Sequence, residues 1–380
     1  MTSRRQFFWV LAAAALGGVL LLQAVSPSVS FAAEERSESK KRSETKKRSE
    51  TKKRSETKKR SETKKRSETK KRSETKKRSE TKNSVALAPD GENFALDFET
   101  SEIRGGIRAD GAYHGVARLI HKRTGLQVID QRYSALNLYR LFSTNLGMGT
   151  PRGMQRQIKV DNNSAEIRWA ATAGHRGEIT ARYEVHEPNI VDLAVTVRSL
   201  GTYSNYEILL PSYFDKTMVP HVHLKRRAGG AKQNGKADLV VPMVNDVFRG
   251  GVLAFPRDEH AARMCLDGRW SRREYKMSVA PFYPVRHYGR CMAVVTDPGK
   301  KVGVVLMAHP RHCSAISARY HAEKDEDRLT SYTAIDLSLF GNDFLPGDQR
   351  TVKVRLVLTE LDDDFSQPLA LYDAFISKNE

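Results

Sequence analysis

Short runs in which hydrophobic and polar residues alternate dominate residues 84–380. The clearest run places Val191, Leu193, Val195 and Val197 on one face, because side chains alternate between the two faces of a strand. Turn-forming residues separate the runs, and helical periodicity is scarce. The predicted strands are 115–121, 126–130, 158–160, 165–171, 178–186, 190–197, 292–296, 302–307 and 351–358.

The strongest hairpin signal lies where 292–296 and 302–307 flank Asp297-Pro298-Gly299. One helix is expected near residue 370, with Ser366 as its cap and Pro368 in its first turn. The polar residues 228–235 are expected to form a surface loop. So many antiparallel strands without an internal linker predict an all-β domain, built as two packed sheets or a larger multi-sheet sandwich.

Residues 1–33 are typical of an export signal. Arg4 and Arg5 precede an apolar stretch at 7–25, and small residues at Ala32 and Ala33 suit cleavage by signal peptidase. The Ser-Arg-Arg-x-Phe pattern resembles a twin-arginine signal, which predicts a periplasmic or extracellular location in a bacterium. An uncleaved membrane anchor is the alternative, because about 19 apolar residues can span a bilayer.

Residues 36–83 are eight copies of a hexapeptide close to Arg-Ser-Glu-Thr-Lys-Lys. The chain has a net charge of +19. The copies carry 23 basic and 8 acidic residues, while residues 84–380 carry 39 basic and 35 acidic residues. Without apolar residues, the tract at 34–83 is expected to be disordered or transiently helical. It would bind anionic envelope polymers or lipid head groups, and the nearly neutral remainder is not expected to bind nucleic acid.

Three cysteines, Cys265, Cys291 and Cys313, lie late in the chain. An odd number argues against a complete disulfide framework in an exported protein. One disulfide with a free thiol, and three buried thiols, are both open.

Three groups of short motifs follow one strand order. They are Gly115-Val116-Ala117-Arg118-Leu119-Ile120 with Lys122-Arg123-Thr124-Gly125; residues 190–199 with Pro211-Ser212-Tyr213-Phe214-Asp215; and Phe344-Leu345-Pro346-Gly347-Asp348 with residues 351–358. Together they resemble the first, central and closing strands of the galactose-mutarotase-like β-supersandwich superfamily. The resemblance implies an antiparallel multi-sheet supersandwich over 84–380 that handles sugars on a concave sheet face.

The resemblance also indicates where an epimerase would keep its acid and base. The family's His lies just before Ser/Thr-Tyr-Phe-Asn, a position occupied here by Pro211, which cannot transfer a proton. The family's Glu lies in an apolar strand before the closing Pro-Gly, where this chain offers Asp336. The chain therefore lacks one catalytic position and keeps a shorter acid at the other, which argues against ordinary aldose-epimerase activity.

The densest polar and aromatic cluster is Arg286-His287-Tyr288-Gly289-Arg290. A uronic-acid lyase needs a base for the C5 proton and a cation for the resulting charge. His287 or Tyr288 could act as the base, and Arg286 or Arg290 as the cation. The alternative is an ordinary strand with packed rings and solvated arginines.

The other candidate ligand-binding residues are Tyr213, His221, His223 and Trp270. His221 and His223 share a face if their segment is extended, but no third metal ligand is evident nearby. A polar rim that meets an acidic sugar and a solvated loop are the other interpretations of this segment. Trp270 is either a platform for a sugar ring or ordinary core. No motif for a nucleotide cofactor or a serine nucleophile occurs, so neither a cofactor nor a metal is predicted.

The main functional hypothesis is an exported carbohydrate-binding protein of the bacterial cell envelope. The first alternative is a carbohydrate-active enzyme, either a polysaccharide lyase or an aldose-epimerase-like protein, in which the 286–290 cluster meets Asp336 or Tyr213. The second is a structural envelope protein tethered by its basic tail, without affinity for sugars.

Overall fold

The computed structural model describes residues 88–89, 95–144, 146–161, 163–226, 239–242, 251–270, 278–280, 285–321 and 332–379. The predicted export signal, the repeat tract and the predicted loop at 228–235 lie outside these residues.

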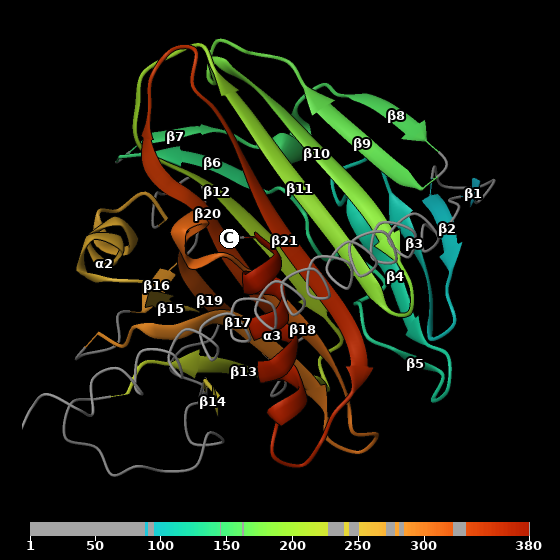
Figure 1. Cartoon of the computed structure of the whole chain (residues 1–380). Coiled ribbons are helices and arrows are strands. Elements are labelled where there is room, and N and C mark those ends of the chain that lie inside the picture. The colour runs from blue at the N-terminus through green and yellow to red at the C-terminus, as the bar shows by residue number, and fades with distance from the viewer. Residues whose placement is uncertain are drawn as a thin grey trace, which may run out of the picture. The chain divides into compact units, whose positions relative to one another are not determined.

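Alternating strands form three sheets (Figure 1). The five-stranded sheet follows chain order and consists of β1 (Ala88–Pro89), β2 (Ala95–Glu99), β3 (Ile103–Arg108), β4 (Gly115–His121) and β5 (Leu126–Gln127).

The nine-stranded sheet has the order β14-β13-β17-β18-β21-β11-β10-β9-β8. Its strands are β8 (Gln157–Asp161), β9 (Ser164–Trp169), β10 (Gly177–His186), β11 (Ile190–Ser199), β13 (Val219–Leu224), β14 (Leu239–Val240), β17 (Tyr288–Asp297), β18 (Val302–Ala308) and β21 (Gln349–Glu360).

The seven-stranded sheet has the order β16-β15-β19-β20-β12-β6-β7 and is antiparallel except between β15 and β16. Its strands are β6 (Arg140–Ser143), β7 (Leu146–Gly149), β12 (Tyr203–Phe214), β15 (Gly251–Pro256), β16 (Ser278–Ala280), β19 (Cys313–His321) and β20 (Tyr332–Phe344). The described helices are α2 (Glu259–Leu266), α3 (Ser366–Asn379) and the 3-10 turns η1 (Pro151–Gly153) and η4 (Pro310–His312).

The main core lies between the nine-stranded and seven-stranded sheets. Leu193 and Val195 of β11 and Leu210 and Ile335 of β12 and β20 belong to one buried cluster. Some central strands are buried on both faces, which explains apolar runs that do not alternate. All seven residues of β18 are buried, since α3 crosses the far side of β17, β18 and β21 (Figure 1) and buries Phe375.

The predicted all-β class is confirmed, and the expected hairpin forms, with Met292 opposite Met307. The C-terminal helix is also present, but Ser366 is its first residue rather than its cap. The Ser366 N–H donates to the Asp364 carboxylate at 3.0 Å, and the Gln367 N–H donates to Asp362 at 2.8 Å.

Two sequence-based expectations differ from the structure. The strand expected at 126–130 is a regular strand only over Leu126–Gln127, and Ile129 forms an isolated antiparallel bridge with Phe214 instead. Helix α2 was not expected, although Asp258 caps it by accepting a hydrogen bond from the Ala261 N–H at 2.9 Å. All three cysteines are free and buried, so the alternative with buried thiols describes this structure.

A buried histidine makes the fold sensitive to acid. His175 is fully buried, with Nε2 at 2.9 Å from the Tyr206 hydroxyl, and burial lowers its pKa from 6.5 to about 4. As pH falls from 6.5 towards 4, the unfolded chain gains a proton that the folded chain does not accept. This group therefore removes about 3 kcal/mol of stability over that range.

We expect His175→Gln, which removes the titration, to lose less stability on acidification than the unsubstituted protein. Urea unfolding at pH 7 and pH 4 measures the difference. Equal losses of unfolding free energy in both proteins would contradict this assignment.

Candidate functional site

Side-chain alternation along β12 divides the seven-stranded sheet into a core face and an outer face. Leu210 points into the main core, so Pro211 and Tyr213 alternate with core-facing residues onto the outer face. Strand register places Asp336 of β20 directly opposite Pro211, and Ser317 of β19 opposite Asp336. The two positions singled out by the family resemblance are therefore cross-strand neighbours.

An ion pair occupies the middle of this outer face. The Arg319 guanidinium donates from Nη2 to Asp336 Oδ1 at 2.6 Å and from Nε to Oδ2 at 2.9 Å, and Ser317 Oγ donates to Oδ2 at 2.9 Å. Asp336 is fully buried and Arg319 is nearly so. Burial alone would lower the pKa of Arg319, but the Asp336 carboxylate raises it above its usual value. Both oxygens of Asp336 are thus engaged by the protein.

Next to this ion pair, tyrosine rings gather around a second arginine. We call this set the tyrosine–arginine cluster: Tyr113, Tyr133, Tyr139, Tyr213, Tyr332 and Arg152. The ring of Tyr133 lies 4.9 Å from that of Tyr213 and 5.1 Å from that of Tyr332. The guanidinium carbon of Arg319 lies 5.7 Å from the Tyr213 ring, which joins the cluster to the ion pair. Tyr213 and Tyr332 are buried, and the other members are half-buried.

Segments far apart in sequence build the cluster. Residues 134–139 run beside β12, since the Asn137 N–H donates to the Pro211 carbonyl and the Tyr213 N–H to the Ser134 carbonyl. Arg152 lies on η1, whose Pro151 carbonyl accepts a hydrogen bond from the buried Trp169 indole at 3.0 Å. The buried Trp169 therefore helps to fix the position of η1, and with it Arg152 of the cluster.

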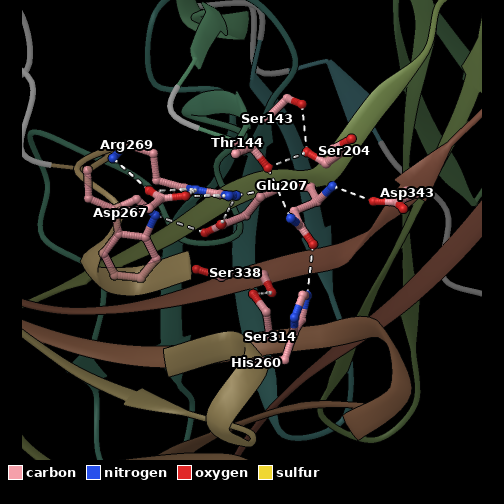
Figure 2. Close-up of polar contacts among 12 residues, drawn as sticks. Ser143, Thr144, Ser204, Glu207, His260, Asp267, Arg269, Ser314, Ser338 and Asp343 are labelled. Carbon is pink, nitrogen blue, oxygen red and sulfur yellow. Dashed lines mark hydrogen bonds and ion pairs between the residues drawn. The ribbon is translucent and has the colours of Figure 1, made fainter. Parts of the chain in front are cut away.

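A second polar network closes the opposite end of the outer face, beside α2 (Figure 2). Glu207 accepts from Arg269 Nη1 at 3.1 Å and from the Trp270 indole at 3.0 Å, and Arg269 also pairs with Asp267. Burial raises the pKa of Glu207, and the charge of Arg269 partly opposes that shift. The loop after α2 is thereby tied to β12.

Asn205 links this network to its surroundings. Its left-handed backbone, with φ of 51°, marks an irregularity at the start of β12. The Asn205 carbonyl accepts from Arg269 at 2.9 Å, and its side chain joins Thr144 at 3.0 Å and His260 of α2 at 2.8 Å. The polar groups of Asn205 are thus bonded to other residues of the protein, which is typical of a structural network.

The structure brings Asp336 and Tyr213 together through Arg319, but places the other predicted site residues elsewhere. Trp270 is 1% exposed, and its indole N–H is bound to Glu207, so its ring packs as core in this structure. The buried Tyr288 hydroxyl donates to the Cys313 carbonyl at 2.6 Å.

The charged residues of the 286–290 segment do not reach Asp336 or Tyr213. Arg290 pairs with Asp373 of α3 at 3.3 Å and contacts the buried His223. His287 lies 3.4 Å from Glu259 at the start of α2. Arg286, two residues before β17, is half-buried.

His221 is also on the α3 side, with its ring 5.1 Å from that of Phe365. Thus the His221 and His223 pair lies beside elements that cover the nine-stranded sheet. Among the described residues, no group of three or more His, Cys, Asp or Glu side chains is arranged to hold a metal ion.

Sequence reasoning missed Arg152, Tyr113, Tyr133 and Tyr139. The candidates evident in the sequence are polar and aromatic residues close together in the chain, whereas these four come from three separate segments. A usable signal was present in the Arg132-Tyr133 and Tyr139-Arg140 pairs, which flank the short segment 134–138.

No protein-family model matches the chain, and no curated protein matches it. Similar solved structures include a galactose 1-epimerase from Lactobacillus acidophilus NCFM, with 9% identity, a TM-score of 0.39, and coverage of 73% of this chain and 99% of that one. An aldose epimerase homologue from C. elegans has 8% identity, a TM-score of 0.39, and coverage of 70% and 98%.

A TPR-domain containing protein from Parabacteroides distasonis has 11% identity and a TM-score of 0.41. The match covers 71% of this chain and 48% of that protein, so the chain spans about half its length. Two of these neighbours carry epimerase names, in line with the expected resemblance to mutarotase-like folds, but at TM-scores of 0.39 the likeness supports nothing beyond the general fold. Within the described part of the chain, no helix is long and apolar enough to cross a membrane.

The Glu207 network gives a stability prediction. We expect Glu207→Leu to destabilise the protein by about 3 kcal/mol, because the buried Arg269 and Trp270 donors lose an acceptor. Glu207→Gln keeps one carbonyl acceptor at the same place and should cost clearly less. Chemical denaturation of both variants measures the difference, and equal costs would show that the hydrogen bonds are not the cause.

Proposed function

We propose that this protein binds carbohydrate through the tyrosine–arginine cluster, in the envelope of a bacterial cell. The observation that carries the proposal is the cluster itself, in which half-buried aromatic rings surround polar groups on one part of a sheet face. Aromatic side chains offer an apolar surface to a sugar ring, while arginine and tyrosine donate hydrogen bonds to its oxygens.

Two positions, Pro211 and Asp336, stand where the resemblance places the catalytic His and Glu of an epimerase. Their chemistry favours binding over epimerase catalysis. Pro211 has no proton to transfer, and both carboxylate oxygens of Asp336 accept hydrogen bonds within the protein. A proton-transfer residue must instead reach the substrate.

A polysaccharide lyase is the second candidate, supported by one specific contact. The Tyr213 hydroxyl accepts a hydrogen bond from Arg152 at 3.0 Å, which pairs a possible base with a cation. Formation of unsaturated oligosaccharides by the unsubstituted protein, and its loss in Tyr213→Phe, would replace the binding proposal with this enzymatic one.

The sugar-binding proposal is tested on a glycan array of acidic and neutral sugars with the full chain. We expect retention of some glycans, weakened about fivefold to tenfold by Tyr113→Ala, because about 1 kcal/mol of ring contact is removed. Tyr203→Ala is the matched control, since it removes a half-buried tyrosine that contacts His175 in the core. Absence of any retained glycan would sink the sugar-binding proposal and leave the structural, tail-tethered alternative.

Export and tethering form the second part of the proposal. The twin-arginine pattern supports export, and the polycationic tract at 36–83 supports attraction to anionic envelope polymers or lipid head groups. Together they suggest a sugar-binding domain held near the envelope by its tail.

We expect deletion of residues 36–83 to abolish salt-sensitive binding to isolated envelopes and to leave the unfolding temperature unchanged. The reason is that salt screens exposed charges, and most of the net charge lies in this tract. Sedimentation with envelopes over a salt series measures the effect. An unchanged salt profile would refute the tethering role, and the array result provides the control for sugar binding.

A further inference from the structure

Arg152 carries a positive charge that no carboxylate of the described residues pairs with. The neighbouring Arg319 is paired with Asp336, and Arg132 is paired with Asp130 at 2.8 Å. Within the described residues, no carboxylate lies within ion-pair distance of Arg152; its polar contacts are to Asn137 and Tyr213. The nearby His114 does not supply a negative charge either, since a histidine side chain is neutral or positive.

The Arg152 guanidinium is held in place by rings and by two hydrogen bonds. Nε donates to Asn137 Oδ1 at 2.6 Å and Nη2 donates to the Tyr213 hydroxyl at 3.0 Å. Its carbon lies 3.9 Å from the centre of the Tyr139 ring and 4.5 Å from that of Tyr113. Asn137 is itself fixed, because its amide donates to the His114 carbonyl at 2.6 Å.

This arrangement leaves one edge of the guanidinium for a ligand. Arginine has five N–H donors, and the two hydrogen bonds use one on Nε and one on Nη2. The two N–H groups of Nη1 and one of Nη2 remain, and a parallel pair with one N–H on each of these nitrogens has the fork geometry that fits a carboxylate. Arg152 is half-buried, so a neutral ligand that covered it would bury a charge without compensation.

We propose that the sugar bound at the tyrosine–arginine cluster is acidic, and that Arg152 receives the carboxylate of a uronic acid residue. The sugar ring would rest on the tyrosines while the carboxylate lies at the open edge of the guanidinium. This inference rests on the proposed sugar-binding function and specifies its ligand class.

The test compares acidic sugars with their neutral counterparts on the full chain. The probes are trimers of galacturonate, glucuronate and mannuronate, each as the free acid and as the methyl ester, which keeps the skeleton and removes the charge. Titration calorimetry is performed at moderately raised salt, because salt screens the exposed basic tail more than a half-buried site. We expect at least one acid to bind at least about tenfold more tightly than its ester.

Three variants separate the cluster from the tail. Arg152→Gln removes the charge and should abolish the preference for the acid, whereas Arg152→Lys keeps the charge without the planar fork and should retain a reduced preference. Arg198→Gln is the charge-matched control, because Arg198 is exposed on β11 of the nine-stranded sheet. Thermal unfolding verifies that each variant is folded. The ratio of acid to ester affinity in the unsubstituted protein tests the proposal even if a variant does not fold.

The outcomes are distinct. Loss of the acid preference in Arg152→Gln with retention in Arg198→Gln supports the proposal. Equal binding of acids and esters overturns the acidic class but leaves sugar binding intact. A preference that survives in Arg152→Gln belongs to other charges and also overturns it. If no acid and no ester binds, while the array also retains no glycan, the proposed function itself fails.

Discussion

Two buried carboxylates on one sheet face, Glu207 and Asp336, each require an arginine, and this requirement organises the outer face of the seven-stranded sheet. A buried carboxylate without a partner would be strongly destabilising. Arg269 satisfies the first and fixes the loop after α2, while Arg319 satisfies the second from the adjacent strand β19. The Glu207–Arg269 pair lies at the end of this face beside α2. The Asp336–Arg319 pair lies nearer the half-buried tyrosines.

These paired arginines differ from Arg152 in having a carboxylate partner among the described residues. Arg269 and Arg319 are neutralised within the fold, so they contribute structure. Arg152 is held by an amide, a phenol and aromatic rings, which orient a guanidinium without cancelling its charge. The same residue type therefore serves stability at two positions, and at the third we propose that it serves recognition.

Much of the fold could be predicted from local sequence, because it depends on alternation and turn chemistry. The hairpin around Asp297-Pro298-Gly299 and the strand 190–197 are of this kind, and both formed. The site could not be read in the same way, because Arg152 and Tyr213 are 61 residues apart in the chain and meet only through the tertiary fold. The cluster at 286–290 looked chemically rich in sequence, yet the fold uses Tyr288 and Arg290 to attach neighbouring elements.

The strand order of the nine-stranded sheet has a kinetic consequence. β21 lies between β18 and β11, and it follows every other strand of that sheet in the chain. During synthesis the strands of this sheet therefore emerge as two groups, β8 to β11 and then β13, β14, β17 and β18. Their facing edges remain unpaired until Gln349–Glu360 arrives. Open edges of this kind are sites of wrong pairing with other chains. The nascent protein thus exposes two sheet edges until its last strand, β21, pairs with them. The rate of that pairing governs how many molecules fold before they aggregate.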